Sequence, residues 1–189
     1  MPKFKITKSH IEGLCIIEPF IHGDSRGYFV ETYNQNEMCE AGLDTTFVQD
    51  NQSMSSNGVL RGLHFQKLFP QGKLVRVIKG SVFDVAVDLR NGSSTYAQWH
   101  GEELSESNMK QLYIPEGFAH GFLVLSDIAV VFYKVTDFYH PNDEGGLMWN
   151  DPDINIKWPL DGIDNIILSD KDKINPTLKE FNPNWFSIK

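Results

Sequence analysis

Glycine and proline interrupt this sequence roughly every ten residues, which leaves only short segments in which regular structure can form. The segments between them are rich in Val, Ile, Phe and Tyr, residues that are enriched in β-strands. Several short strands at this spacing predict an all-β antiparallel sandwich or barrel with one or a few short helices. The expected strands cover residues 14–21, 28–33, 46–52, 59–66, 73–79, 82–89, 98–104, 111–114, 121–125 and 129–135.

One helix is predicted in the first quarter of the chain. Asn34 can cap its first turn, residues 35–41 fill it, and Gly42 can end it. Residues 140–159 are expected to be rich in loops, and residues 176–189 to form a tail that packs on the domain or crosses to a partner. A chain of 189 residues without an evident linker or repeat predicts one domain, residues 1–189.

The charge balance and the apolar runs disfavour several classes of function. A net charge of −8 disfavours a nucleic-acid partner, because binding to a phosphate backbone needs a dense cationic face. The longest apolar run, residues 128–133, is far too short to span a bilayer, and residues 1–10 lack the apolar stretch of a signal peptide. Cys15 and Cys39 have no metal-binding or redox spacing. We therefore expect a cytoplasmic protein without membrane or nucleic-acid partners.

A set of groups suited to proton transfer is the main functional signal in the sequence. His64 follows Arg61 closely, and Lys73 lies nine residues after the histidine. Histidine accepts a proton near neutral pH, and a lysine can stabilise the negative charge that develops on oxygen when a carbon acid is deprotonated. Downstream, Tyr133 could return a proton and Asp170 could orient the histidine. Together these residues predict an enzyme that moves protons next to a carbonyl group without a cofactor.

Strand periodicity sets a condition on this cluster. Arg61 and His64 are three residues apart, so a regular strand would place their side chains on opposite faces. Both side chains reach one ligand only if the strand bends, and Gly62 is the residue that would permit a β-bulge. Tyr133 lies among β-branched neighbours, so its alternative role is packing in the core.

The segment 115–121 matches the second half of the cupin motif, P-x-G-x-x-H, which lies at a turn of a small jelly roll. The first half of that motif normally supplies a His-x-His pair and a glutamate to a metal ion. Here His64 is followed by Phe65 and Gln66, which leaves His64 and His120 as possible ligands, fewer than the usual three. The sequence therefore predicts no metal site.

Seven short strings, in order along residues 13–172, together resemble one known family. They are DSRGYFVE (24–31), QDN (49–51), VLRGLHFQ (59–66), GKLVRV (72–77), PEGFAHGF (115–122), YKV (133–135) and LSDKD (168–172). The set resembles the dTDP-4-dehydrorhamnose 3,5-epimerase family, cofactor-free enzymes of the cupin superfamily. The resemblance implies a homodimeric jelly roll that converts dTDP-4-dehydro-6-deoxy-D-glucose to dTDP-4-dehydro-L-rhamnose in dTDP-L-rhamnose biosynthesis.

The resemblance also assigns roles to individual positions. It implies that His64 is the general base, that Asp170 orients it, and that Tyr133 is the general acid on the opposite face of the sugar. Lys73 would stabilise the enolate. The implied substrate-binding residues, with Arg26 reaching the pocket of the neighbouring subunit, are Arg26, Phe29, Glu31, Gln49, Asn51, Arg61, His120, Tyr139, Glu144 and Lys171.

Three other functions fit parts of the pattern. A relative that epimerises only C3 or only C5 of a related dTDP-4-keto-6-deoxyhexose would keep the same base and acid. A non-catalytic cupin that binds sugar nucleotides would keep the arginines but lose the base, the acid or the orienting carboxylate, and all three are present in the sequence. A metal-dependent cupin oxygenase would need the ligands that the first half of the motif lacks.

Overall fold

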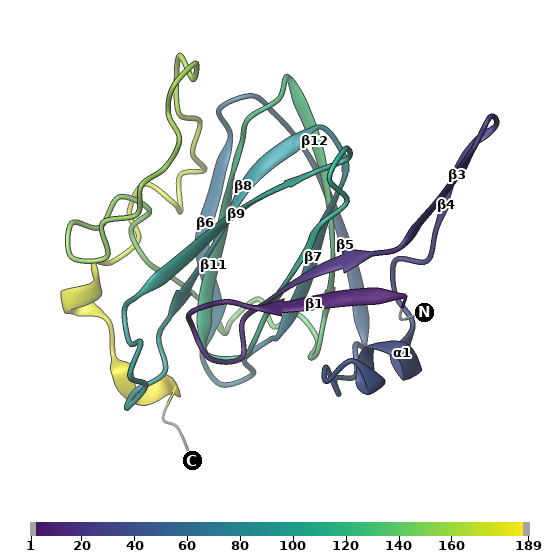
Figure 1. The fold of residues 1–189 in the computed structure, drawn as a ribbon. Coiled ribbons are helices and arrows are strands. Elements are labelled where there is room, and N and C mark those ends of the chain that lie inside the picture. The colour runs from purple at the N-terminus through teal and green to yellow at the C-terminus, as the bar shows by residue number, and fades with distance from the viewer. Residues whose placement is uncertain (1–2, 187–189) are drawn as a thin grey trace.

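Two antiparallel sheets face each other in the computed structural model, which describes residues 3–186 (Figure 1). One sheet contains β1 (Phe4–Lys8), β2 (Cys15–Pro19), β5 (Gln49–Ser56), β7 (Lys73–Lys79), β10 (Gln111–Ile114) and β12 (Ile128–Val135), in the order β1-β2-β10-β7-β12-β5. The other contains β6 (Leu60–Gln66), β8 (Ser81–Asp88), β9 (Trp99–Ser105), β11 (Phe118–Val124) and β13 (Glu144–Gly146), in the order β13-β6-β11-β8-β9. The predicted all-β class is confirmed, and the sheets remain open at their edges instead of closing into a barrel.

The main hydrophobic core fills the space between the two sheets. Val75 on β7 and Val131 on β12 belong to the same buried cluster as Val82 on β8 and Phe122 on β11. Side chains alternate between the faces of a strand, so the inward-facing residues of each sheet are removed from water. Each fully buried aliphatic side chain contributes about 1.5–3 kcal/mol relative to its exposed state, which holds the sheets together.

The predicted helix is present as α1 (Gln35–Glu40). The Asn34 side chain accepts a hydrogen bond from the backbone N–H of Glu37, as a helix N-cap does. Met38 is fully buried and belongs to a small cluster with Leu74 of β7, whose neighbour Val75 belongs to the core between the sheets. Since successive side chains point to opposite faces of a strand, the helix covers part of the outer face of the larger sheet.

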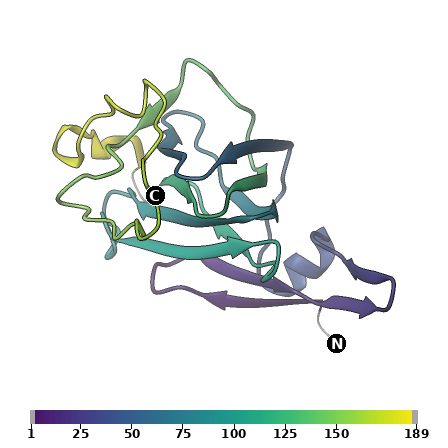
Figure 2. The same cartoon turned by 90° about the horizontal axis from the view of Figure 1, so that it is seen from above.

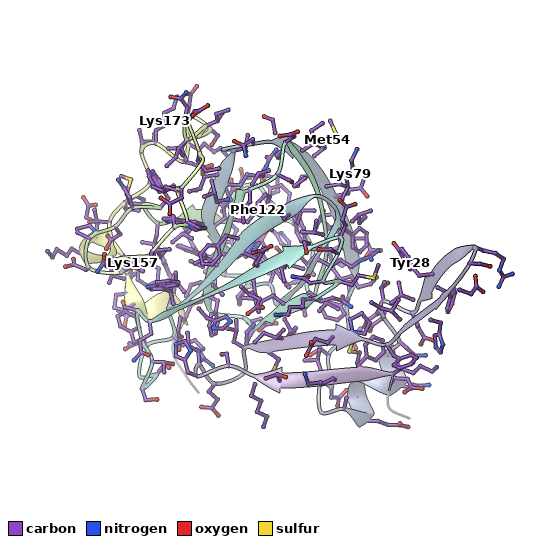
Figure 3. All side chains as sticks on the ribbon, turned by 45° about the horizontal axis from the view of Figure 1, so that its top comes forward. Tyr28, Met54, Lys79, Phe122, Lys157 and Lys173 are labelled. Carbon is purple, nitrogen blue, oxygen red and sulfur yellow. The ribbon has the colours of Figure 1, made fainter. Side chains whose placement is uncertain are left out.

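A hairpin formed by β3 (Ile21–Asp24) and β4 (Gly27–Val30) projects away from the two sheets (Figures 1 and 2). The sequence predicted one strand over residues 14–21, but the chain leaves the sheet at Pro19, which has no N–H to donate to a ladder. Tyr28 lies on this hairpin, outside the body of the molecule (Figure 3). No residue of either hairpin strand is buried.

The end of the described chain packs against the five-stranded sheet. Two short 3-10 turns, η1 (Leu178–Glu180) and η2 (Pro183–Phe186), follow a loop-rich region. The rings of Phe181 and Phe186 contact the ring of Phe65, with centroids 5.6 Å and 5.4 Å apart. The predicted tail therefore packs on its own domain up to residue 186, and its last three residues lie outside the described range. Within residues 3–186, no helix is long and apolar enough to cross a membrane.

Candidate active site

A cavity of about 390 Å³ lies between the two sheets. This volume is in the range typical of small-molecule sites. Phe122, labelled in Figure 3, is one of the residues that line it. The cavity is lined by Gln49, Asn51, Ser53, Arg61, His64, Phe65, Gln66, Gln71, Lys73, His120, Phe122, Tyr133, Tyr139 and Glu144. Nine of the predicted site residues are in that set: eight lie on strands of the two sheets, and Tyr139 lies in the loop between β12 and β13.

His64 has a buried carboxylate as its partner. Its Nε2 lies 2.5 Å from Oδ1 of Asp172, whose side chain is 3% exposed. Burial alone would raise the pKa of Asp172, but hydrogen bonds from His64, Ser169 and the Gly62 backbone outweigh burial and lower it. An ionised Asp172 accepts the Nε2 proton, which leaves Nδ1 of the imidazole as the nitrogen that can take a proton from a substrate.

The prediction that Asp170 orients the histidine is wrong. Its side chain is fully exposed, and it accepts a hydrogen bond from Lys173. The chain turns tightly here, with the Lys173 N–H bonded to the Ser169 carbonyl and the Asp172 N–H bonded to the Ser169 hydroxyl. This turn directs Asp172 toward β6 and leaves Asp170 in solvent.

Strand β6 bends at Gly62, as the joint use of Arg61 and His64 requires. The pairing of β6 with β11 shifts register between His120 and Phe122, and Gly62 has φ +119°. Both Arg61 and His64 consequently line the same cavity. The Arg61 guanidinium is held by two hydrogen bonds of 3.0 Å to the Ser55 hydroxyl.

Lys73, the first residue of β7, is 9% exposed and lines the cavity. Burial lowers the pKa of its amine to about 8, and the nearby charges of Asp84 and Glu144 oppose that shift. The amine therefore remains mostly protonated at neutral pH and offers a poorly solvated positive charge to a ligand.

Tyr133 lies on β12, in the sheet opposite to His64. Burial raises the pKa of its phenol, while the charge of Arg61 acts in the other direction. The raised pKa keeps the hydroxyl protonated at neutral pH, the state in which it can donate a proton. Tyr133 also packs against the main core, so the same side chain both contacts the core and lines the cavity.

A second histidine–carboxylate pair lies beside the first. Nε2 of His120 is 3.0 Å from both carboxylate oxygens of Asp84, and both side chains are buried. Burial lowers the pKa of His120, and Asp84 opposes that shift. Asp84 was not predicted as a site residue. The signal was a carboxylate inside the apolar strand β8, because such groups are rarely buried without a partner.

The remaining predicted residues lie at the rim of the cavity or away from it. Lys171 forms an ion pair of 2.6 Å with Glu144, which lines the cavity. Arg26 and Phe29 lie on the hairpin, and Glu31 follows it and pairs with Lys3. This chain alone does not bring those three residues to the cavity.

Five lining residues were not predicted as site residues: Ser53, Phe65, Gln66, Gln71 and Phe122. Strand periodicity could have predicted Ser53, since it shares one face of β5 with Gln49 and Asn51. Among the described residues, no group of three or more His, Cys, Asp or Glu side chains could hold a metal ion.

An imidazole on one sheet, a phenol on the other and a buried cation line one cavity of a cupin-like sandwich, an arrangement typical of an isomerase that acts by proton transfer. The comparisons with known proteins agree. The chain belongs to the dTDP-4-dehydrorhamnose 3,5-epimerase family, whose sequence model matches residues 8–180.

Several curated relatives carry that name. The protein of Methanothermobacter thermautotrophicus is 55% identical over 97% of this chain and 98% of its own length. The protein of Pseudomonas aeruginosa is 54% identical over 89% of this chain and 93% of its own length. Among solved structures, the dTDP-6-deoxy-D-glucose-3,5-epimerase of Legionella pneumophila, in complex with dTDP-4-keto-L-rhamnose, has a TM-score of 0.93 at 47% identity, with 98% of each chain covered.

Proposed function

We propose that this chain epimerises C3 and C5 of dTDP-4-dehydro-6-deoxy-D-glucose, with His64 as base, Tyr133 as acid and Lys73 as the cation that stabilises the enolate. The observation that carries the proposal is the placement of His64 and Tyr133 on facing sheets of one cavity. Inversion of a carbon centre requires that a proton leave from one side and return from the other, which this arrangement permits.

The proposed steps follow from the chemistry of the ketone. The C4 carbonyl acidifies the protons on C3 and C5, so His64 can take one of them while negative charge moves onto the C4 oxygen. Lys73 stabilises that charge, an interaction commonly worth roughly 3–4 kcal/mol when the donor is preorganised. Tyr133 then gives a proton to the opposite face of the carbon. Exchange with solvent returns a proton to Tyr133 and removes one from His64 before the second centre reacts.

Proton NMR of the keto-sugar nucleotide, incubated with the protein in D₂O, tests this function. Deuterium at both C3 and C5 of a rhamno-configured product is the expected result. Label at one carbon only would indicate a single epimerase, an activity that a structural relative 33% identical to this chain has, the 3'-monoepimerase of Streptomyces bikiniensis. Relatives from six organisms, 50–55% identical to this chain, are named 3,5-epimerases, which favours the double reaction.

The proposal includes a homodimer in which the hairpin of each copy completes the cavity of the other. Arg26 is 87% exposed at its side chain, and the guanidinium forms an ion pair with Asp24, two residues away on the same hairpin. Tyr28 and Phe29 are 64% and 70% exposed, an unusual state for adjacent aromatic rings. A second copy that covers these rings would also bring Arg26 to a cavity. The cytoplasmic location expected from the sequence is part of the proposal, and cell fractionation would test it.

A further inference from the structure

Two buried polar residues outside the proposed chemistry hold together the loops at the cavity. Gln66, at the end of β6, is 5% exposed, and Asp143, directly before β13, is 7% exposed. Residues 67–72 connect β6 to β7, and residues 136–143 (the 136–143 strap) connect β12 to β13. Both connections cross from one sheet to the other.

From the end of β6, the Gln66 side chain forms hydrogen bonds with both the 67–72 connection and the strap. Its side-chain oxygen accepts a hydrogen bond of 2.7 Å from the His140 N–H, and its side-chain nitrogen donates to the carbonyls of Phe69 at 2.6 Å and Phe138 at 3.1 Å. This pattern needs one acceptor and two donors at the end of a long side chain, which only a glutamine supplies. All three bonds go to backbone groups.

Asp143 makes the reciprocal connection. Its carboxylate accepts hydrogen bonds of 2.9 Å from the N–H groups of Leu68 and Phe69. The rings of Phe69 and His140, one from each connection, are stacked with their centroids 4.1 Å apart. Gln66 and Asp143 thus form a two-sided clamp on the strap.

The clamp fixes the position of Tyr139. The residues before and after it, Phe138 and His140, are the two strap residues that Gln66 binds. Tyr139 is 49% exposed, lines the cavity, and its N–H donates to the Gln49 side chain at 3.1 Å. A ring this exposed has little packing of its own to hold it, so its placement depends on the backbone on either side.

We propose that Gln66 and Asp143 are positioning residues for binding of the nucleotide sugar, because they order the 136–143 strap before the ligand arrives. This inference rests on the proposed function and deepens it. A strap that is ordered in the free protein loses less conformational freedom on binding, and affinity is higher for that reason. The side chains of Gln66 and Asp143 form no hydrogen bond with His64, Tyr133 or Lys73. Loss of the clamp should therefore weaken ligand binding and leave proton transfer largely unchanged.

The test compares Gln66→Met with a matched control, Asn57→Leu. Methionine keeps the length of the side chain and removes all three hydrogen bonds. The Asn57 side chain also donates hydrogen bonds to backbone carbonyls of another loop, those of Leu125 and Ser126, but it does not line the cavity. We expect Gln66→Met to weaken dTDP binding in calorimetry about tenfold and to raise KM similarly, with kcat within about threefold of wild type. Asn57→Leu should lower Tm without a change in dTDP affinity.

Several outcomes would overturn the inference. One is Gln66→Met that binds dTDP like the wild type while its Tm falls as in Asn57→Leu. Another is a change confined to kcat. Gln66 itself lines the cavity, so Asp143→Asn is tested whether or not Gln66→Met folds, because Asp143 does not line it. This variant, which keeps one acceptor oxygen, should show a smaller loss of affinity in the same assay, and an unchanged affinity would again refute the clamp. Wild-type protein that binds no dTDP would instead refute the proposed function itself.

Discussion

Asp172 and Asp170 offer a matched pair of substitutions at the residue scale. Asp172→Asn should lower kcat by about 10²–10⁴-fold, because the amide no longer selects the imidazole tautomer with a free Nδ1. The dTDP affinity should stay near wild type, since Asp172 does not line the cavity. Asp170→Asn should have near-normal kinetics, because its side chain is fully exposed. Steady-state rates and calorimetry check both variants, and equal losses in the two would contradict the assignment of Asp172.

The choice between these two carboxylates shows where residue-level prediction stops. The sequence predicted that a carboxylate near residue 170 orients a histidine more than 100 positions earlier in the chain. Asp170 and Asp172 are the same residue type, two positions apart in one turn, and the hydrogen bonds to Ser169 decide which of them faces β6. Those bonds are local, but the contact between Asp172 and His64 depends on how the turn packs against β6, and such a long-range contact leaves no pattern in the sequence.

Substitution of Tyr133 separates acid catalysis from packing. With Tyr133→Phe, His64 still removes protons, but the enolate is returned mainly from the side it came from. We expect deuterium in recovered substrate and little rhamno-configured product, measured by NMR in D₂O. A residue that only packs would instead cost about 1 kcal/mol of stability from a lost hydroxyl bond and leave turnover intact. Near-normal product formation would place the acid elsewhere, with Tyr139 as the next residue to test.

Lys73 should set the alkaline limit of activity. Its pKa is lowered to about 8, so the positive charge is present below that pH and is lost as the pH rises through it. We therefore expect kcat/KM to fall above about pH 8, because this parameter reports ionisations of the free enzyme. Lys73→Arg, which stays protonated, should be slower but lack this descending limb. A limb that persists near pH 8 in the arginine variant would assign it to another group.

At the scale of elements, the bend in β6 depends on a single glycine. A Cβ at Gly62 would lie 2.6 Å from the Gly121 Cα and 2.7 Å from the His120 carbonyl oxygen, and Gly62 has a positive φ. We expect Gly62→Ala to destabilise the fold by about 2–4 kcal/mol in urea unfolding. Gly42→Ala is the control, because Gly42 also has a positive φ but nothing within 4 Å, so its cost should be about 1 kcal/mol. Similar losses in both variants would show that the close approach to β11 is unimportant.

Strands that carry their own pattern were predicted well, and strands that depend on neighbours were not. The bounds of β7 and β10 agree with the sequence, since each is a β-prone segment with a clear end. Strand β13, Glu-Gly-Gly, has low strand propensity and pairs only because β6 lies beside it. Its glycines are required by close packing, as a Cβ on Gly145 would lie 2.5 Å from the Phe65 ring.

At the scale of the whole molecule, the spacing of strands and breakers was sufficient to predict two facing antiparallel layers. It was not sufficient to predict a hairpin that leaves both layers. Ile21, Tyr28 and Phe29 look like core residues in the sequence, yet all three are at least 40% exposed. The outer face of the larger sheet also exposes Met54, at 70%. In the proposed homodimer, a second copy would cover the exposed rings of the hairpin and remove them from water.

Active-site complementation tests the exchange of hairpins between two copies. Arg26→Ala and His64→Asn should each be inactive or strongly impaired as homodimers. Co-expression should produce mixed dimers in which one cavity combines the intact His64 of one copy with the intact Arg26 of the other, and turnover should reappear. His64→Asn with Tyr133→Phe is the control pair, because both residues belong to one cavity of one copy, and no mixture restores it. Turnover that stays absent in purified mixed dimers of the first pair would show that Arg26 does not cross to the neighbouring site.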